Sequence, residues 1–333
     1  MIIKKMDKKN LIAVTGGAGY IGSHSVQALL NCGYEVLILD NLSTGFEFLI
    51  NKGAIFEKVD LLDYESLKKV LKKYKPAVVI HFAALIIVSA SFDEIYNYFM
   101  NNSVGTLNLL NCMYENDIEN IVFSSTAAVY GITNHRNLIT ENDLLNPINP
   151  YGFSKRASEK LISYLKFSNN FNFSILRYFN VAGADASLEI GELHQNESHV
   201  IPLLIMAHLK NETFSVNGMD YDTFDGTAIR DYVHVSDLAK AHVLALQYNI
   251  LEKKDITCNL GTGRGISVLE LISEIKKINP NFLYDIKEKR QGDPSKLVAD
   301  IDIAKEILNW EPTQSNISNI IHSSLAWHKN SLS

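Results

Sequence analysis

Short apolar runs alternate with longer amphipathic segments through the first half of the chain. Apolar runs of this length, bounded by turn residues, are typical of strands buried in a parallel sheet. They predict strands at residues 11–15, 35–39, 55–59, 77–81 and 121–124. The segments between them predict helices at residues 20–31, 63–73, 101–114 and 151–165.

This alternation predicts an α/β fold, a doubly wound parallel sheet with helices on both faces, which is the Rossmann arrangement. A smaller mixed α/β region is expected to follow and to close over a substrate. We therefore expect two domains, residues 1–180 with the sheet and residues 181–333 with mainly the smaller region.

A glycine-rich turn, Gly16-Gly-Ala-Gly-Tyr-Ile-Gly22, joins the first predicted strand to the first predicted helix. Glycines at positions 16, 19 and 22 allow a tight turn and let a pyrophosphate approach the backbone at the helix N-terminus. A glycine triplet alone is a weak signal, but its position between a strand and a helix strengthens it. The turn predicts a dinucleotide-binding site.

Asp40 ends the second predicted strand and indicates which dinucleotide is bound. A carboxylate there accepts hydrogen bonds from both ribose hydroxyls and repels a 2′-phosphate, and no arginine adjoins it. NAD is therefore expected rather than NADP. The alternative is that Asp40 only caps a loop.

The segment Asn149-Pro-Tyr-Gly-Phe-Ser-Lys155 opens the last of these helices. Proline fits the first turn of a helix, and Tyr151 and Lys155 then share one face, four residues apart. A phenol ordinarily titrates near pH ~10, but a neighbouring ammonium and the helix dipole both favour the phenolate. Tyr151 is thus a candidate general base with a lowered pKa. Taken alone, the spacing of Tyr151 and Lys155 favours two surface residues with no chemistry.

Two further strand ends bring polar side chains to the same edge of the sheet. The strand at residues 121–124 leads into Ser124-Ser-Thr-Ala-Ala-Val-Tyr-Gly131, and the strand before it ends at His81. Loops after such strand ends line the crevice where dinucleotides bind. We expect the Ser/Thr cluster and the Tyr/Lys helix to face the nicotinamide together, and His81 to be a core residue.

Composition and charge exclude several classes of function. The formal net charge of −6 disfavours binding to nucleic acid or to an anionic membrane surface. The Lys-rich start of the chain lacks the apolar centre of a secretory signal, and the longest apolar run, at residues 77–90, is too short to span a bilayer. The three cysteines are far apart, and the histidines form no His-x-x-x-His or His/Cys cluster. We expect a cytoplasmic protein without a metal site.

The motifs together resemble the extended short-chain dehydrogenase/reductase family. The resemblance runs in order from about Leu11 to Trp327 and also includes His81-Phe-Ala-Ala84 and Leu176-Arg-Tyr-Phe-Asn180. Its most specific parts come late in the chain, at residues 225–237 and in Arg290-Gln-Gly-Asp293. Within the family, the chain is most similar to enzymes that invert C4 of a UDP-linked sugar.

That resemblance implies reversible, NAD-dependent 4-epimerisation of UDP-glucose and UDP-galactose through a transient 4-keto sugar. Tyr151 would take the proton from the sugar 4′-hydroxyl while hydride passes to the nicotinamide. Lys155 would bind the nicotinamide ribose and keep Tyr151 ionised, and Thr126 would hydrogen-bond the 4′-oxygen. A homodimer, paired through the Tyr/Lys helix and the helix before it, is implied as well. The resemblance also implies that segments of the two domains interleave, so the boundary near residue 180 is approximate.

The resemblance also assigns two sets of binding residues. The cofactor set is Gly16, Gly19, Tyr20, Ile21, Gly22, Asp40, Asn41, Leu42, Ser43, Thr44, Gly45, Asp60, Leu61, Phe82, Ala83, Ala84, Leu85, Ile86, Asn102, Ser124, Tyr151, Lys155 and Phe179. The UDP-sugar set is Thr126, Tyr151, Asn180, His199, Val200, Ser215, Val216, Asn217, Arg230, Arg290, Asp293 and Leu297. Two arginines suit a diphosphate because the guanidinium fork matches phosphate oxygens.

Two positions depart from the family pattern, and a second glycine-rich segment is expected to have only a structural role. Many relatives carry Lys where Ile86 stands and an aromatic residue where Asn217 stands, which weakens one cofactor contact and the assignment of the uracil site. A second glycine-rich segment, Gly261-Thr-Gly-Arg-Gly265, is expected to be a plain strand-to-helix turn. The reason is that Ser267-Val-Leu-Glu270 is a capping box for the helix that follows.

Other functions fit the sequence less well. A sugar-nucleotide 4,6-dehydratase needs an Asp-Glu pair, and a UDP-glucuronate decarboxylase a Glu, where this chain has Ala127-Ala128. An NAD-sensing regulator would not need Tyr151, Lys155 and Thr126 together, and a simple alcohol dehydrogenase would not need the UDP-type residues. An epimerase of UDP-N-acetylglucosamine and UDP-N-acetylgalactosamine, or of another UDP-sugar, stays open as the main alternative.

Overall fold

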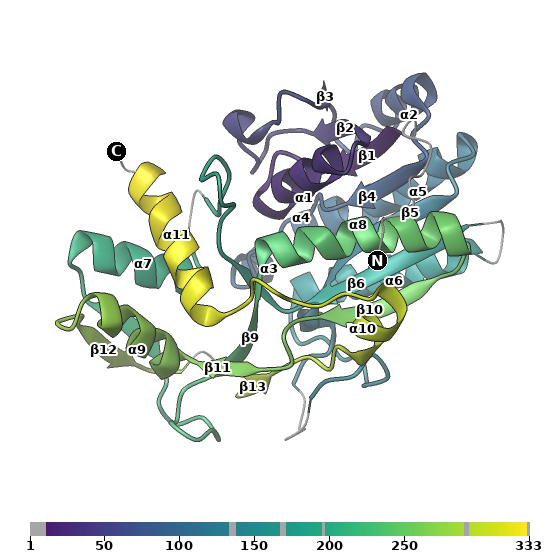
Figure 1. Ribbon diagram of the computed structural model, residues 1–333. Helices are drawn as coiled ribbons and strands as arrows, with labels where there is room; N and C mark the ends of the chain where they lie inside the picture. The colour runs from purple at the N-terminus through teal and green to yellow at the C-terminus, as the bar shows by residue number, and fades with distance from the viewer. Residues whose placement is uncertain (1–10, 133–137, 167–170, 195–196, 290–292, 332–333) are drawn as a thin grey trace.

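A seven-stranded parallel sheet is the centre of the protein (Figure 1). The computed structural model describes residues 11–132, 138–166, 171–194, 197–289 and 293–331. The strands lie in the order β10-β6-β5-β4-β1-β2-β3. Their bounds are β1 (Leu11–Thr15), β2 (Glu35–Asp40), β3 (Ile55–Lys58), β4 (Val78–His81), β5 (Asn120–Thr126), β6 (Asn172–Tyr178) and β10 (Ile256–Leu260). The predicted fold class is confirmed.

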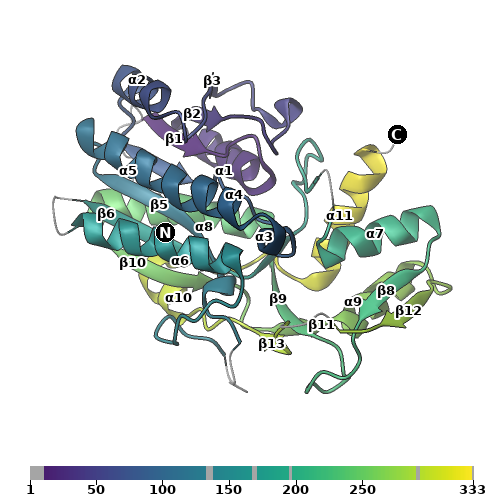
Figure 2. The same ribbon diagram turned by 180° about the vertical axis from the view of Figure 1, so that it is seen from behind.

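Side chains alternate between the two faces of the sheet, and each face has its own helices. One face packs with α1 (Tyr20–Asn31) and α8 (Val235–Glu252), which lie in front of the sheet in Figure 1. The other packs with α2 (Tyr64–Tyr74), α5 (Gly105–Glu115) and α6 (Pro150–Leu165) (Figure 2). Burial on both faces is why these strands are apolar throughout.

A smaller mixed region lies beside the sheet, at the lower left of Figure 1. It has a core of its own beneath three helices, α7 (Val200–Lys210), α9 (Val268–Ile278) and α11 (Ile317–Ser331). Its strands form two small sheets: β7 (Asn180–Ala182), β9 (Ile229–His234), β11 (Gly265–Ser267) and β13 (Lys296–Leu297) in one, and β8 (Phe214–Asn217) and β12 (Tyr284–Lys287) in the other.

Helix α8 and strand β10 come from the second half of the chain but pack with the first. Strand β10 pairs with β6 at the edge of the large sheet, and α8 lies against α1. The chain therefore crosses the expected boundary near residue 180 and returns before completing the smaller region. In the described parts of the chain, no helix is both long and apolar enough to cross a membrane.

Three further α-helices lie in the described part of the chain. They are α3 (Ala90–Asp93), α4 (Ile95–Phe99) and α10 (Asp302–Leu308). Residues Met100–Val104 form a π-helical turn before α5, so the helix expected at residues 101–114 begins with a different hydrogen-bond pattern. Strand β5 runs on to Thr126, beyond its predicted end at residue 124, and so carries Thr126 to the edge of the sheet.

Candidate active site

A cavity of about 1200 Å³ follows the carboxyl ends of the parallel strands and continues between the large sheet and the smaller region. Loops after β1, β2, β4, β5 and β6 form one side of it, and residues of β8, β9 and β13 form the other. This is the crevice in which doubly wound folds bind their ligands.

The glycine-rich turn lines the cavity at the start of α1. A Cβ on Gly16, whose φ is +71°, would lie 2.6 Å from Ala83 N, and one on Gly22 would lie 2.1 Å from Gly16 O. Glycine is therefore required at both positions. Helix α1 has no side-chain cap and no acidic residue in its first turn, so its N-terminal amides can receive an anion.

Asp40 ends β2 at the cavity wall and is 8% exposed. Its Oδ2 accepts a hydrogen bond from Ala18 N at 3.0 Å and its Oδ1 accepts one from Leu42 N at 2.8 Å. Each oxygen keeps a second lone pair, and together they can receive the two hydroxyls of a ribose. With the uncapped helix and the glycine cradle, this carboxylate makes the cavity fit NAD.

Most of the predicted cofactor residues line this cavity, and two lie behind its wall. Leu42 has a φ of +60° and closes the turn after β2 through its N–H. Asn102 is 2% exposed and bridges the loop after β4 to α6: its Oδ1 accepts from Leu85 N at 2.8 Å and its Nδ2 donates to Ser154 Oγ at 3.0 Å. Asn102 therefore holds the wall in place.

Helix α6 aims Tyr151 and Lys155 into the cavity. Asn149 caps the helix, with its Oδ1 accepting from Gly152 N at 2.8 Å, and Pro150 occupies the first turn as the sequence predicts. Tyr151 is 9% exposed and Lys155 is 3% exposed. Lys155 Nζ donates to Ser124 O at 2.8 Å, which holds the ammonium at the end of β5.

Burial dominates the electrostatics of this pair and changes the expectation for Tyr151. Desolvation raises the Tyr151 pKa to about 12, although a hydrogen bond with Thr126 acts to lower it. Desolvation also lowers the Lys155 pKa to about 7. The sequence predicted a lowered Tyr151 pKa from the neighbouring ammonium and the helix dipole; in this structure the loss of solvent is the larger effect.

The end of β5 completes this group of polar side chains. Thr126 lines the cavity, and its Oγ1 accepts from Ala128 N at 3.1 Å. Ser124 Oγ makes a short hydrogen bond with the hydroxyl of Tyr178, a cavity residue at the end of β6. Sequence reasoning did not assign Tyr178 to the site, although it stands within the motif at residues 176–180.

A buried ion pair fixes α6 against the sheet. Arg177 Nε donates to Glu159 Oε1 at 2.9 Å, and its Nη2 donates to Glu159 Oε2 at 2.8 Å. Ser125 Oγ donates to the same carboxylate at 2.5 Å, and Tyr130 stacks near the guanidinium. Burial acts to lower the pKa of Arg177, but the Glu159 carboxylate outweighs burial and raises that pKa above its ordinary value. The pair therefore ties α6 to β6.

The predicted UDP-sugar residues gather on the opposite wall of the cavity. Asn180, His199, Val200, Ser215, Asn217, Arg230, Asp293 and Leu297 all line it. Arg230 Nη2 donates to Asp293 Oδ1 at 2.6 Å. Val216 alternates with its neighbours along β8, so its side chain packs in the core of the smaller region. Arg290 lies outside the described residues.

His81 and the second glycine-rich segment both have structural roles. His81 is buried between Thr15 Oγ1, 2.7 Å from its Nδ1, and Thr106 Oγ1, 2.9 Å from its Nε2, and burial lowers its pKa to about 3. The amides of Thr262 and Gly263 donate to the Asp231 carboxylate. The turn leads first into β11, and the predicted capping box then opens α9.

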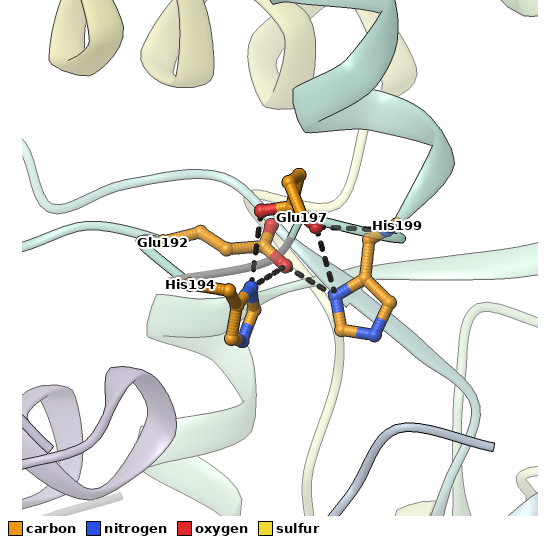
Figure 3. Close-up of side chains that lie close together, drawn as sticks. All are labelled: Glu192, His194, Glu197 and His199. Atoms are coloured by element: carbon orange, nitrogen blue, oxygen red, sulfur yellow. Dashed lines mark hydrogen bonds and ion pairs between the residues drawn. The ribbon is translucent and has the colours of Figure 1, made fainter. Parts of the chain in front are cut away.

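Sequence reasoning missed a cluster of four titratable residues, three of which line the cavity. Glu192, His194, Glu197 and His199 lie together in the loop before α7 (Figure 3). Their spacing matches neither His-x-x-x-His nor a His/Cys pattern, so only their convergence in the loop reveals them.

Comparisons with known proteins agree with this geometry. Residues 12–261 match the NAD dependent epimerase/dehydratase family. A UDP-glucose 4-epimerase of Rhizobium meliloti (strain 1021) is 43% identical over 323 residues, which cover 96% of this chain and 98% of that protein.

Solved structures are similar over the same extent. The UDP-glucose 4-epimerase from Brucella ovis, in complex with NAD, superposes with a TM-score of 0.91 at 38% identity, covering 95% of this chain and 98% of that one. The enzyme from Stenotrophomonas maltophila, with bound NAD and formylated UDP-arabinopyranose, gives a TM-score of 0.93 at 34% identity, covering 97% and 99%. Because the family match spans most of the chain and the relatives are similar over nearly its whole length, the chain belongs to the NAD dependent epimerase/dehydratase family.

Proposed function

We propose that this protein interconverts UDP-glucose and UDP-galactose by inverting C4 of the sugar, with bound NAD as its cofactor. One observation carries the proposal: Tyr151, Lys155 and Thr126 converge on a cavity that has the NAD-type cradle on one wall and Arg230, Asp293 and Leu297 on the other. When bound, NAD supplies a positively charged ring that accepts a hydride from C4 and returns it to the opposite face.

The protein's own residues handle the proton and the position of the sugar. Tyr151 takes the proton of the C4 hydroxyl and returns it as general acid. Lys155, held on Ser124 O, is assigned the positive charge that favours the phenolate form of Tyr151. Thr126, hydrogen-bonded with Tyr151, directs the reacting oxygen toward the phenol. Arg230 lies where it can bind phosphate oxygens of the UDP.

The residues that follow β5 favour epimerisation over dehydration. Ala127 and Ala128 line the cavity beside Thr126, where a 4,6-dehydratase would need a carboxylic acid and a carboxylate. A methyl group transfers no proton. At this position the chain therefore has no acid or base that could remove the C5 proton and expel water. A C4 epimerisation does not need such groups there.

The purified protein is expected to carry NAD and to convert UDP-galactose into UDP-glucose with no added cofactor. The reason is that a hydride returned to the same sugar leaves NAD in its starting state, and the cradle described above can retain it. The measurement is product analysis by chromatography, with NAD quantified after acid release. Complete dependence on added NADP, with release of a keto product, would contradict the epimerase proposal.

Leu297 is proposed to bound the pocket beside the 2′-substituent of the sugar. It lies in β13, in register with Arg230, and lines the cavity. A pocket wall discriminates by only about 1–3 kcal/mol per methylene-sized change, so neither sugar class is strictly excluded. UDP-glucose and UDP-galactose are expected as the main pair, with weak activity on the N-acetylated sugars.

Changing the size of this side chain should shift that preference in both directions. Leu297→Tyr is expected to abolish the weak activity and spare the main one, whereas Leu297→Ser should raise it. Values of kcat/KM for both sugar pairs in the three proteins give the answer. A wild type that prefers UDP-N-acetylglucosamine would show that this wall has been misassigned.

A homodimer is also proposed, paired through α6 and the helix before it, α5. Apolar side chains on α4, α5 and α6 are exposed in the single chain, among them Tyr96, Leu107, Tyr114 and Phe153. Contiguous exposed apolar side chains often mark an interface. A cytoplasmic location and the division near residue 180 into an NAD-binding and a UDP-sugar-binding domain stay predictions.

A further inference from the structure

Four potential metal ligands meet in the loop between β7 and α7. Glu192, His194, Glu197 and His199 each direct one nitrogen or oxygen atom toward the others, and these four atoms all lie within 4.8 Å of one another (Figure 3). All four residues come from a segment of eight positions, so one short loop brings the whole set together.

The distances within the cluster suit a small cation. His194 Nδ1 lies 3.0 Å from Glu197 Oε2 and 3.7 Å from Glu192 Oε1. His199 Nδ1 lies 2.5 Å from Glu192 Oε1 and 4.0 Å from Glu197 Oε1. Around a tetrahedral zinc ion with bonds of about 2.0–2.1 Å, ligand atoms are about 3.3 Å apart. The observed separations lie on both sides of that value.

An unpartnered buried oxygen points independently to a missing ligand. Glu192 is 3% exposed, and its Oε2 has no hydrogen-bond partner although it is buried. Buried carboxylate oxygens are ordinarily satisfied. The ion pairs that the structure describes for Glu192 and Glu197 are with the two imidazoles. A divalent cation would balance both carboxylates while the imidazoles stay neutral.

Surrounding hydrogen bonds orient the carboxylates before any ion arrives. Glu197 Oε1 accepts from the amides of Ser198 and His199 at 2.7 and 2.8 Å, which leaves Oε2 facing His194. Trp327 Nε1 donates to the carbonyl of Glu192 at 2.9 Å and fixes the backbone there. Such outer contacts are what hold metal ligands in position.

We propose that Glu192, His194, Glu197 and His199 bind one divalent transition-metal ion, with Zn²⁺ the best match to two imidazoles and two carboxylates. Four protein ligands make a closed site, and closed zinc sites are structural. The ion would fasten the loop at the cavity wall to the start of α7. The proposal does not depend on which sugar the cavity binds.

The test uses the untagged, NAD-loaded protein after a chelator has removed any bound metal. Metal binding is then measured directly, without any sugar substrate. Titration calorimetry with Zn²⁺ should give one ion per chain, and Co²⁺ should give the visible absorption of a tetrahedral nitrogen–oxygen site. Zn²⁺ should also raise the unfolding temperature by several degrees. His194→Asn and Glu197→Gln should each weaken Zn²⁺ binding by more than about a hundredfold.

His322→Asn is the matched control, because this exposed histidine lies on α11 and bonds only within its own helix turn in the hydrogen bonds described. It should bind Zn²⁺ as the wild type does. The proposal is overturned if the wild type does not bind one Zn²⁺ per chain. It is also overturned if a cluster variant that retains its NAD binds Zn²⁺ as tightly as the wild type does. An equal loss in His322→Asn overturns it as well, because binding would then be nonspecific.

Discussion

Replacing Tyr151 by phenylalanine is expected to lower kcat by about a hundredfold to ten-thousandfold, the usual cost of losing a general base. Phenylalanine keeps the ring and its packing but removes the proton acceptor. Lys155→Met should be similarly damaging. Burial raises the Tyr151 pKa to about 12, so ionisation of the phenol requires an opposing positive charge, which is the role proposed for Lys155. The rate of conversion of UDP-galactose, at saturating substrate, is the measurement.

Two further variants calibrate this result. Thr126→Ala should do less harm, because only a hydrogen bond to the reacting oxygen is lost. Lys160→Met, at an exposed position on the same helix, should leave the rate unchanged. Near-normal rates for both Tyr151→Phe and Lys155→Met would rule out the proposed mechanism, provided that both variants retain NAD.

Breaking the ion pair between Arg177 and Glu159 is expected to cause the largest loss of stability. Both side chains are buried, and removing one partner leaves the other charged and unpaired in the interior. Arg177→Met and Glu159→Leu should therefore each lower the free energy of unfolding by about 3–5 kcal/mol. Replacing both together should recover most of that loss, because neither charge then stays buried.

Denaturant unfolding at a fixed NAD concentration measures these differences, since bound NAD itself stabilises the native state. The exposed pair between Lys277 and Glu274 is the control, and its removal should cost less than about 1 kcal/mol. Additive losses in the double variant would show that Arg177 and Glu159 stabilise the protein through separate contacts.

Elements with local signals could be predicted from the sequence closely. Helix α1 spans the predicted residues because a glycine turn starts it and Gly33, with a φ of +84°, follows its end. Asn149 and Pro150 start α6 in the same way. Caps and turns depend on residues only a few positions apart, so they can be predicted from the local sequence alone.

The sequence could predict which residues belong to the candidate site, but not how deeply each is buried or which side chains it contacts. The pairing of Tyr151 with Lys155 follows from helix spacing, yet the direction of the Tyr151 pKa shift follows from burial by segments distant in sequence. The expectation that Asn102 binds the cofactor stays a prediction, whereas its hydrogen bonds with Leu85 and Ser154 became visible only in the folded chain.

The sequence by itself therefore determined the fold class, the dinucleotide turn and the helix that carries the Tyr/Lys pair. Only the tertiary structure decided that α8 and β10 return to the large sheet and that Glu192 and His199 meet in one loop. The physical reason is the separation along the chain over which each interaction acts. Capping and periodicity act between near neighbours, whereas desolvation, ion pairing and sheet order depend on which distant segments pack together.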